Sequence, residues 1–276
     1  MSKYYSNLFL TPSMNSVEMR ISNFFPKLKY KFLMTFGSLL ISPNSNVEGI
    51  KPDKSVSLKK TDNKQIIYQL PDAENKGNVS VEEALCNRRS HRSYLKTRIS
   101  AQDLSQILWA AYGITRPLER YPEMRGGLRS APSAGARYPL EIYVFAGNVS
   151  GMKSGVYKYV SQSHTLVCIF DKDMRKELSV AALYQKMLRI APACLLFCAV
   201  FDRTTQGYGE RGQRYVFAEL GHSAQNVYLQ AEALHLGTCA TGAFNDDDVR
   251  RVIPLPDDEE PLYLMPIGYF FALPEF

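Results

Sequence analysis

The chain has 276 residues, of which 45% are hydrophobic and 22% charged, as in an ordinary soluble globular protein that buries a sizeable core. Its net charge of +6 lies entirely in residues 1–60, where nine Lys or Arg stand against Glu18, Glu48 and Asp53. The remaining body has no net charge and so lacks the positive field of a nucleic-acid-binding domain, and we expect no nucleic-acid partner.

The most hydrophobic stretch, residues 32–41, follows three lysines and has about half of the ~20 apolar residues that a membrane span needs. We therefore predict no transmembrane span, and the stretch begins too far from Met1 for a simple secretory signal. Such a segment can lie on a membrane surface, but we favour a partner-wrapping arm or a packed helix. Residues 1–79 are interpreted as an N-terminal basic arm and linker, with one short extended piece at residues 65–70.

Helices and strands alternate over residues 80–276, which we assign to one domain. Ser80 and Ser100 each begin a helix with a capping pattern, and Gly113 ends the second helix. Periodicity predicts further helices at residues 176–189, 214–236 (capped by Gly237) and 246–252. Strands are predicted at residues 140–145, 156–160, 165–170, 194–201 and 263–268, with the second and third forming a hairpin. This alternation indicates a mixed sheet with helices on its faces.

The segment Arg88-Arg89-Ser90-His91-Arg92-Ser93-Tyr94 places three guanidiniums and two hydroxyls directly after the first predicted helix. Arginine forks and serine hydroxyls suit phosphate oxygens, because several donors converge on a compact dianion. Taken alone, such a cluster is more often a solvated or salt-bridged surface. Residues 115–139, rich in Gly, Pro and Arg, are predicted to form a long loop, and long ordered loops are commonly functional.

Gly207-Tyr208-Gly209-Glu210-Arg211-Gly212 matches the Gly-x-Gly-x-x-Gly pattern of dinucleotide-binding domains. However, the preceding strand is predicted to end near Phe201, and the acidic residue about 20 positions on, Glu232, falls inside a predicted helix. We therefore reject a Rossmann domain. The five cysteines are odd in number and three lie in apolar runs, which indicates reduced thiols and a cytoplasmic protein. No metal site is predicted, because no Cys-x-x-Cys or His-Glu-x-x-His motif occurs.

Taken in order, the segments from about Ser80 to Gly268 resemble the nitroreductase superfamily, in particular its SagB-type dehydrogenase branch. The resemblance rests on the cluster 88–94 and on residues 108–115, 131–143, 208–212, 219–222, 225–226 and 242–244. It implies an α+β fold, a three-layer α-β-α sandwich with a central mixed, mainly antiparallel sheet. It also implies a homodimer with FMN at the subunit interface.

Carried over by position, the resemblance implies a set of FMN-binding residues. The phosphate and ribityl chain would be held by Arg88, Arg89, Ser90 and Arg92. The isoalloxazine would be reached from the other subunit by Pro132, Ser133, Ala134 and Gly135. Gly242 and Ala243 would approach the reactive edge of the ring, and Gln185 would bond its pyrimidine end. Small residues let backbone N–H groups contact a flat ring closely, although residues 132–135 alone would pass for an ordinary turn.

The sequence departs from the family pattern in two places. No Lys or Arg follows Gly268, where many relatives carry a basic residue that helps clamp the phosphate. The Lys-Tyr pair of azoline-oxidising members is here Gly207-Tyr208. A phenol is a poor base unless a neighbouring cation lowers its pKa, so we predict Tyr208 and Arg211 as the catalytic pair. The alternative is that Tyr208 only packs.

The resemblance implies an FMN-dependent oxidoreductase, in which flavin N5 exchanges a hydride with a stacked substrate. The substrate could be a modified peptide within a biosynthetic complex or a small molecule, or NAD(P)H could drive reduction of nitro or quinone compounds. A non-catalytic flavin- or peptide-binding member of the same fold is the other alternative, suggested by Gly207 and by the C-terminus without a basic residue.

Overall fold

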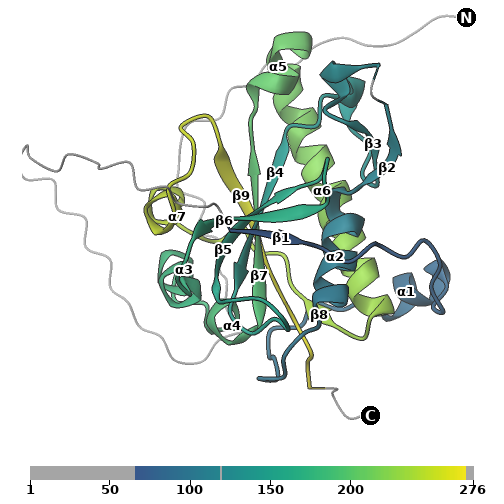
Figure 1. Cartoon of the computed structure of the whole chain (residues 1–276). Helices are drawn as coiled ribbons and strands as arrows, with labels where there is room; N and C mark the ends of the chain where they lie inside the picture. Colours follow the sequence, from purple (N-terminus) through teal and green to yellow (C-terminus); the bar gives the residue numbers. More distant parts are fainter. Residues whose placement is uncertain (1–65, 119, 272–276) are drawn as a thin grey trace, which may run out of the picture. The chain divides into compact units, whose positions relative to one another are not determined.

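A seven-stranded sheet forms the centre of the computed structural model, which describes residues 66–118 and 120–271 (Figure 1). Its order is β1-β6-β5-β4-β7-β9-β8, and each neighbouring pair is antiparallel. The strands are β1 (Ile67–Gln69), β4 (Leu140–Ala146), β5 (Gly155–Val160), β6 (Thr165–Phe170), β7 (Ala193–Ala199), β8 (Gly237–Thr238) and β9 (Glu260–Gly268). The predicted α+β class with a mainly antiparallel sheet is confirmed.

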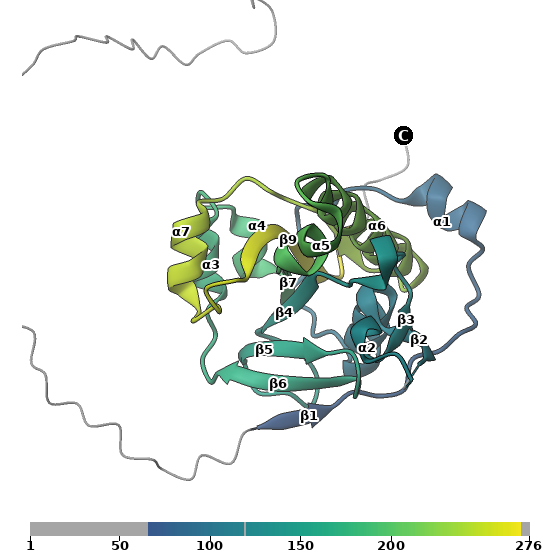
Figure 2. The same cartoon turned by 90° about the horizontal axis from the view of Figure 1, so that it is seen from above.

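Helices cover both faces of this sheet (Figure 2). One layer contains α2 (Ala101–Tyr112) and α6 (Arg211–Ala233), against which α1 (Val81–Asn87) and α5 (Asp202–Tyr208) pack. The other layer contains α3 (Arg175–Ala181), α4 (Lys186–Ile190) and α7 (Asp246–Val252). The described residues include no helix that is long and apolar enough to span a membrane.

The alternation of side chains along β4 explains the two cores. Leu140, Ile142 and Val144 face α2 and α6, whereas Tyr143 and Phe145 face the other helical layer. The neighbouring strand β7 is buried along its whole length, as its continuous apolar run predicts. The three layers therefore follow from strand periodicity combined with two apolar helix faces.

Two predicted helices differ from the observed ones. The segment 176–189 forms two short helices instead of one, because Leu183 and Tyr184 adopt left-handed backbone conformations with φ of 56° and 61°. The long helix ends at Ala233, since the backbone turns left-handed at His235 (φ 55°). Gly237 lies in β8 and does not cap the helix, so that prediction was wrong.

The predicted loop 115–139 contains regular structure. Strands β2 (Ile114–Pro117) and β3 (Gly127–Arg129) form a small antiparallel sheet there. At Gly127, φ is 141° and a Cβ would lie 2.2 Å from the carbonyl oxygen of Arg116, so the close pairing requires glycine.

The extended piece expected at residues 65–70 is the edge strand β1, paired with β6. Strand β1 lies before residue 80, where we predict that the domain begins. This domain boundary stays a prediction. The predictions for the hydrophobic stretch 32–41 and the basic arm lie outside the described residues.

Candidate functional site

The arginine segment 88–94 leaves α1 and runs beside the short strand β8. The backbone N–H of His91 donates to the carbonyl of Thr238 at 2.9 Å. The hydroxyls of Ser90 and Tyr228, a residue of α6, lie 3.1 Å apart. The segment is therefore held in place by the end of the sheet and by the long helix. Tyr228 was not singled out from the sequence, where its only signal is a position inside a helical repeat.

The three guanidiniums of this segment have little to neutralise them. Arg88 lies over the ring of Tyr228, 5.2 Å from its centroid, and Arg89 donates to the carbonyl of Cys86 at 2.8 Å. Arg92 makes one long contact, 3.5 Å, to the carbonyl of Ser90. None of the three pairs with a carboxylate within residues 66–118 and 120–271. These arginines therefore do not form a salt-bridged surface within the described structure, and their charge is available to an anion.

Gln185 and the segment 241–243, which includes Gly242 and Ala243, lie together. The side-chain amide of Gln185 donates to the carbonyl of Ala243 at 2.7 Å and accepts from the hydroxyl of Thr241 at 3.2 Å. Gly242 and Ala243 are exposed. Two residues earlier, the backbone N–H of Ala240 donates to the Tyr228 hydroxyl at 2.7 Å. Tyr228 thus joins the arginine segment to the strand that leads to Gly242.

A second group of predicted residues meets at the other end of α6. The turn 134–136 passes through Gly135 at φ 59°, and a Cβ there would lie 2.7 Å from the hydroxyl oxygen of Tyr208. The ring of Tyr208 packs edge-on against Tyr215 of α6, with centroids 5.1 Å apart. The structure therefore brings Tyr208 and the small-residue turn together on one chain.

The Gly-x-Gly-x-x-Gly pattern at residues 207–212 spans the junction of α5 and α6, not a strand-to-helix turn, in agreement with the rejection of a Rossmann domain. A Cβ at Gly207 would lie 3.2 Å from the guanidinium of Arg137. Arg137 therefore occupies the space beside the position where the resemblance to azoline-oxidising members would place lysine, a contact that sequence reasoning missed. Arg211 begins α6 and lines a cavity with Arg214 and Phe217, so its role beside Tyr208 stays a prediction.

A buried carboxyl group lies beneath the turn. Glu219 of α6 is 2% exposed and accepts a hydrogen bond from the Tyr112 hydroxyl, which in turn accepts from the backbone N–H of Leu140 at 3.2 Å. Burial raises the pKa of Glu219 to about 7, although hydrogen bonds from Ser133 and Tyr112 oppose the shift. The carboxyl group therefore titrates near neutral pH, directly below the turn that carries Ser133.

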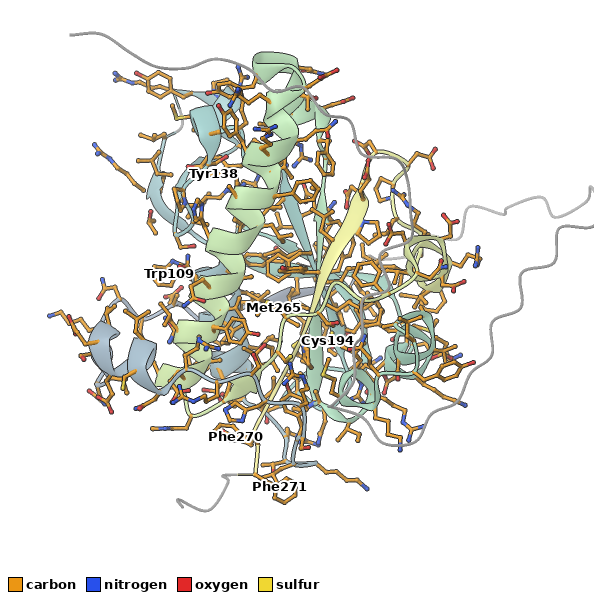
Figure 3. The ribbon with its side chains drawn as sticks, turned by 180° about the vertical axis from the view of Figure 1, so that it is seen from behind. Trp109, Tyr138, Cys194, Met265, Phe270 and Phe271 are labelled. Atoms are coloured by element: carbon orange, nitrogen blue, oxygen red, sulfur yellow. The ribbon has the colours of Figure 1, made fainter. Side chains whose placement is uncertain are left out.

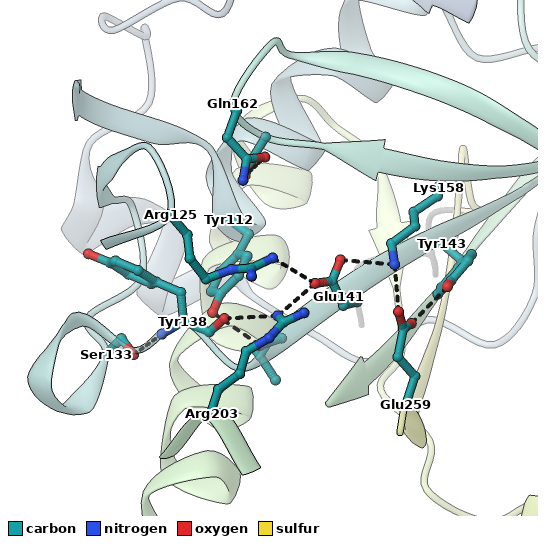
Figure 4. Close-up of polar contacts among 12 residues, drawn as sticks. Tyr112, Arg125, Ser133, Tyr138, Glu141, Tyr143, Lys158, Gln162, Arg203 and Glu259 are labelled. Carbon is teal, nitrogen blue, oxygen red and sulfur yellow. Dashed lines mark hydrogen bonds and ion pairs between the residues drawn. The ribbon is translucent and has the colours of Figure 1, made fainter. Parts of the chain in front are cut away.

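An ion-pair network anchors this end of the sheet (Figure 4). Its centre is Glu141 of β4, 9% exposed, which pairs with Arg125 (3.0 Å), Lys158 (3.2 Å) and Arg203 (2.6 Å). Burial alone would raise the pKa of Glu141, but the three cations hold it below its usual value. Since Arg203 belongs to α5 and also donates to the carbonyl of Tyr138 at 3.3 Å, the network ties the helix of Tyr208 to the segment after the turn.

The two groups of predicted residues are far apart on one chain. Tyr215, which contacts Tyr208, and Tyr228, which contacts Ser90, are thirteen residues apart in α6, or about 20 Å along the helix axis. Figure 3 shows the same separation, with Tyr138 near one end of α6 and Phe270, which stacks on His91 with ring centroids 3.7 Å apart, near the other. One chain therefore carries the arginine segment and Tyr208 at opposite ends of α6.

The helix-flanked antiparallel sheet defines an α+β protein, and at the end of β8 it carries an arginine segment that pairs with no carboxylate of the described residues. The Nitroreductase family matches residues 85–269, and the chain belongs to this family of oxidoreductases. A protein of Methanocaldococcus jannaschii named as a nitroreductase is 47% identical over 200 residues, which cover 72% of this chain and 94% of that protein. The microcin B17-processing protein McbC of Escherichia coli is 23% identical over 206 residues, covering 72% and 73%. Among solved structures, a nitroreductase-family structure from Ralstonia eutropha superposes with a TM-score of 0.64 at 26% identity, covering 75% of this chain and 90% of that one.

Proposed function

We propose that the protein is an FMN-dependent oxidoreductase of the nitroreductase and SagB-type dehydrogenase kind, acting in the cytoplasm as a homodimer. The observation that carries this proposal is the segment 88–92, whose three guanidiniums have no carboxylate partner in the described structure. A dianionic phosphate is the ligand that such a set of donors favours. All five thiols are free, which supports a reducing compartment.

The donors along this edge fit the rest of FMN as well. Ser90 is half-buried and offers a hydroxyl next to the arginines. The backbone N–H of Gly242 makes no hydrogen bond within the described part of the chain, and the residue is exposed. Gln185 uses one amide N–H on Ala243 and keeps its second N–H for a ligand. The phosphate, the polyol chain and the flat ring each have a matching set of groups.

The flavin bound there would supply hydride exchange at N5 with a stacked substrate. In this assignment Arg88, Arg89 and Arg92 bind the phosphate, and Gln185 orients the pyrimidine end. Gly242 and Ala243 approach the ring because they carry little or no side chain. Tyr208 would take a proton from the substrate, with Arg137 or Arg211 as the neighbouring cation.

The distance between the two groups supports the proposed homodimer. Tyr208 and Gly135 lie at one end of α6, about 20 Å from the end that holds Ser90. One FMN molecule whose phosphate is bound by the arginine segment could have its ring contacted by Gly135 or Tyr208 if a second copy brought its own turn to the site. We therefore assign Pro132, Ser133, Ala134 and Gly135 to the ring bound by the partner subunit.

The substrate class rests on the relatives. Similarity to a microcin-processing protein favours a modified peptide handled within a biosynthetic complex. Similarity to a protein named as a nitroreductase favours a small molecule as substrate. The electron donor we propose in that case is NAD(P)H. Incubation of the reduced protein with a nitroarene or a quinone, and of the oxidised protein with an azoline-containing peptide, would separate the two, since only one substrate should reoxidise or reduce the flavin quickly.

The visible spectrum of the purified full-length chain tests the proposal. We expect flavin absorbance that is bleached by dithionite or NAD(P)H and restored by air. A colourless protein that cannot be reconstituted with FMN would contradict flavin binding. A yellow protein that never turns over would favour the alternative, a non-catalytic flavin- or peptide-binding member.

Mixed dimers test the shared site. Arg92→Ala should damage the phosphate end and Tyr208→Phe the other end, each in the subunit that carries it. If the site is shared, a heterodimer of the two variants has one site with both defects and one intact site, so mixing should restore up to about half of wild-type activity per dimer. No recovery after subunit exchange would indicate that each chain builds its own site.

A further inference from the structure

A basic cavity on the described body is lined by none of the residues assigned to FMN. Its volume is about 390 Å³, and it is lined by Lys96, Asn148, Arg175, Arg189, Ile190 and Pro192. This volume is within the range of small-molecule pockets. Arg189 lies in the last turn of α4, whereas Gln185 precedes the first turn of the same helix. The cavity and the proposed flavin site are therefore neighbours at opposite ends of a short helix.

Arg175 forms a rigid part of the wall. Its guanidinium pairs with Asp173 through two hydrogen bonds of 2.9 and 2.7 Å and donates to the carbonyl of Ala191 at 2.6 Å. It also lies against Gly147, where a Cβ would be 1.7 Å from the central guanidinium carbon. These contacts use three of the five N–H donors of the side chain and fix its position. A pre-oriented guanidinium binds an anion with little loss of side-chain entropy.

The remaining charges of the cavity are also positive. Lys96 and Arg189 are exposed, and neither pairs with a carboxylate in the part of the chain that the structure describes. Asn148 is engaged elsewhere, because its amide accepts from Arg98 at 3.0 Å and donates to the carbonyl of Lys96 at 3.1 Å. No carboxylate of the described residues lines the cavity, and the nearby Asp173 is already neutralised by Arg175. An anion here meets two cations without a carboxylate partner in the described structure, Lys96 and Arg189, and a third guanidinium, Arg175, whose charge Asp173 offsets but which keeps free N–H donors.

We propose that this cavity binds a phosphate ester. The phosphate is held by Lys96, Arg175 and Arg189, and the organic part lies against Ile190 and Pro192. Inorganic phosphate has no apolar group that could contact this wall, so the wall favours an ester over the free ion. The site requires neither FMN binding nor turnover at the other site.

Calorimetric titration of the full-length protein, first saturated with FMN, tests the site with three probes: adenosine 5′-monophosphate, adenosine and inorganic phosphate. We expect the monophosphate to bind best, phosphate more weakly, and adenosine not measurably. The double variant Lys96→Gln/Arg189→Gln should lose at least tenfold in affinity for the monophosphate. Both residues are exposed, so the variant should keep the wild-type circular dichroism spectrum and FMN content.

Two control variants show whether the binding belongs to this cavity. Lys153→Gln/Arg116→Gln removes the same charge from exposed positions elsewhere and should leave affinity unchanged. Arg92→Gln should also leave it unchanged if the cavity is distinct from the flavin site. The proposal is overturned if no probe binds, if either of these variants loses as much affinity as the cavity variant, or if inorganic phosphate binds as well as the ester. If the chain binds no FMN at all, the same titration in the Arg92→Gln background still decides the question.

Discussion

The hydroxyl oxygens of Ser90 and Tyr228 lie 3.1 Å apart although 138 positions separate the residues in the chain. The same tyrosine hydroxyl accepts from the backbone N–H of Ala240 at 2.7 Å. One phenol therefore connects α6 with both edges of the proposed FMN site, the arginine segment and the strand that leads to Gly242.

Tyr228→Phe should lower stability and FMN affinity while it keeps the aromatic ring in place. The ring beneath Arg88 is retained, but Ser90 and Ala240 each lose a partner. We expect a loss of about 1–2 kcal/mol in stability, as is typical for part-buried hydrogen bonds, and a several-fold weaker FMN affinity. Urea unfolding and quenching of flavin fluorescence measure the two effects. Tyr215→Phe, whose hydroxyl has no partner in the described structure, is the matched control. Equal FMN affinity in both variants would refute the connecting role of Tyr228.

Arg92→Ala should reduce FMN affinity by roughly 10- to 100-fold, the range expected for a lost charge-assisted hydrogen bond of about 1.5–3 kcal/mol. The effect should be large, because none of residues 269–276 is a Lys or Arg that could share the phosphate. Arg116→Ala removes an exposed arginine far from the segment and should have no effect. Unchanged flavin retention in the Arg92 variant would show that the phosphate lies elsewhere.

Gly135→Ala should displace Tyr208. The added Cβ would lie 2.7 Å from the phenol oxygen, and the backbone at φ 59° costs an alanine about 1–2 kcal/mol. We expect loss of stability together with loss of activity. Adding Tyr208→Ala should relieve the steric part of the destabilisation and leave the backbone part, whereas activity should stay low. If Tyr208→Phe alone retains full activity on an identified substrate, Tyr208 only packs.

Glu219→Gln should change the pH dependence of stability. The folded-state pKa of about 7 lies above the ordinary value of 4.5, so the unfolded chain releases its proton first and the wild type loses stability as the pH rises from 4.5 to 7. The variant lacks this loss. Its stability relative to wild type should therefore increase by up to about 3 kcal/mol between pH 4.5 and pH 8. Urea unfolding at several pH values measures the difference, and parallel curves for the two proteins would contradict a raised pKa.

Much of the fold could be predicted because its signals are local. The apolar run at Cys194 and the helical repeat at Val216 predicted β7 and α6, and Ser100 with Asp103 forms the capping box that begins α2. Predictions failed where backbone conformation overrode composition. The left-handed residues Leu183 and Tyr184 divide one predicted helix into two, and nothing in their residue types indicates such a break.

The sequence by itself determined the family, the two helical layers and the residues that make up the arginine segment, because these depend on residue order and on short-range periodicity. Only the tertiary structure decided that Arg137 lies against Gly207, that Tyr208 meets Gly135, and that Ser90 meets Tyr228. Such contacts join segments distant in the chain, so they exist only after helices and strands have packed. The suitability of the arginine segment for phosphate also depends on the tertiary structure, because folding places no carboxylate of the described residues against it.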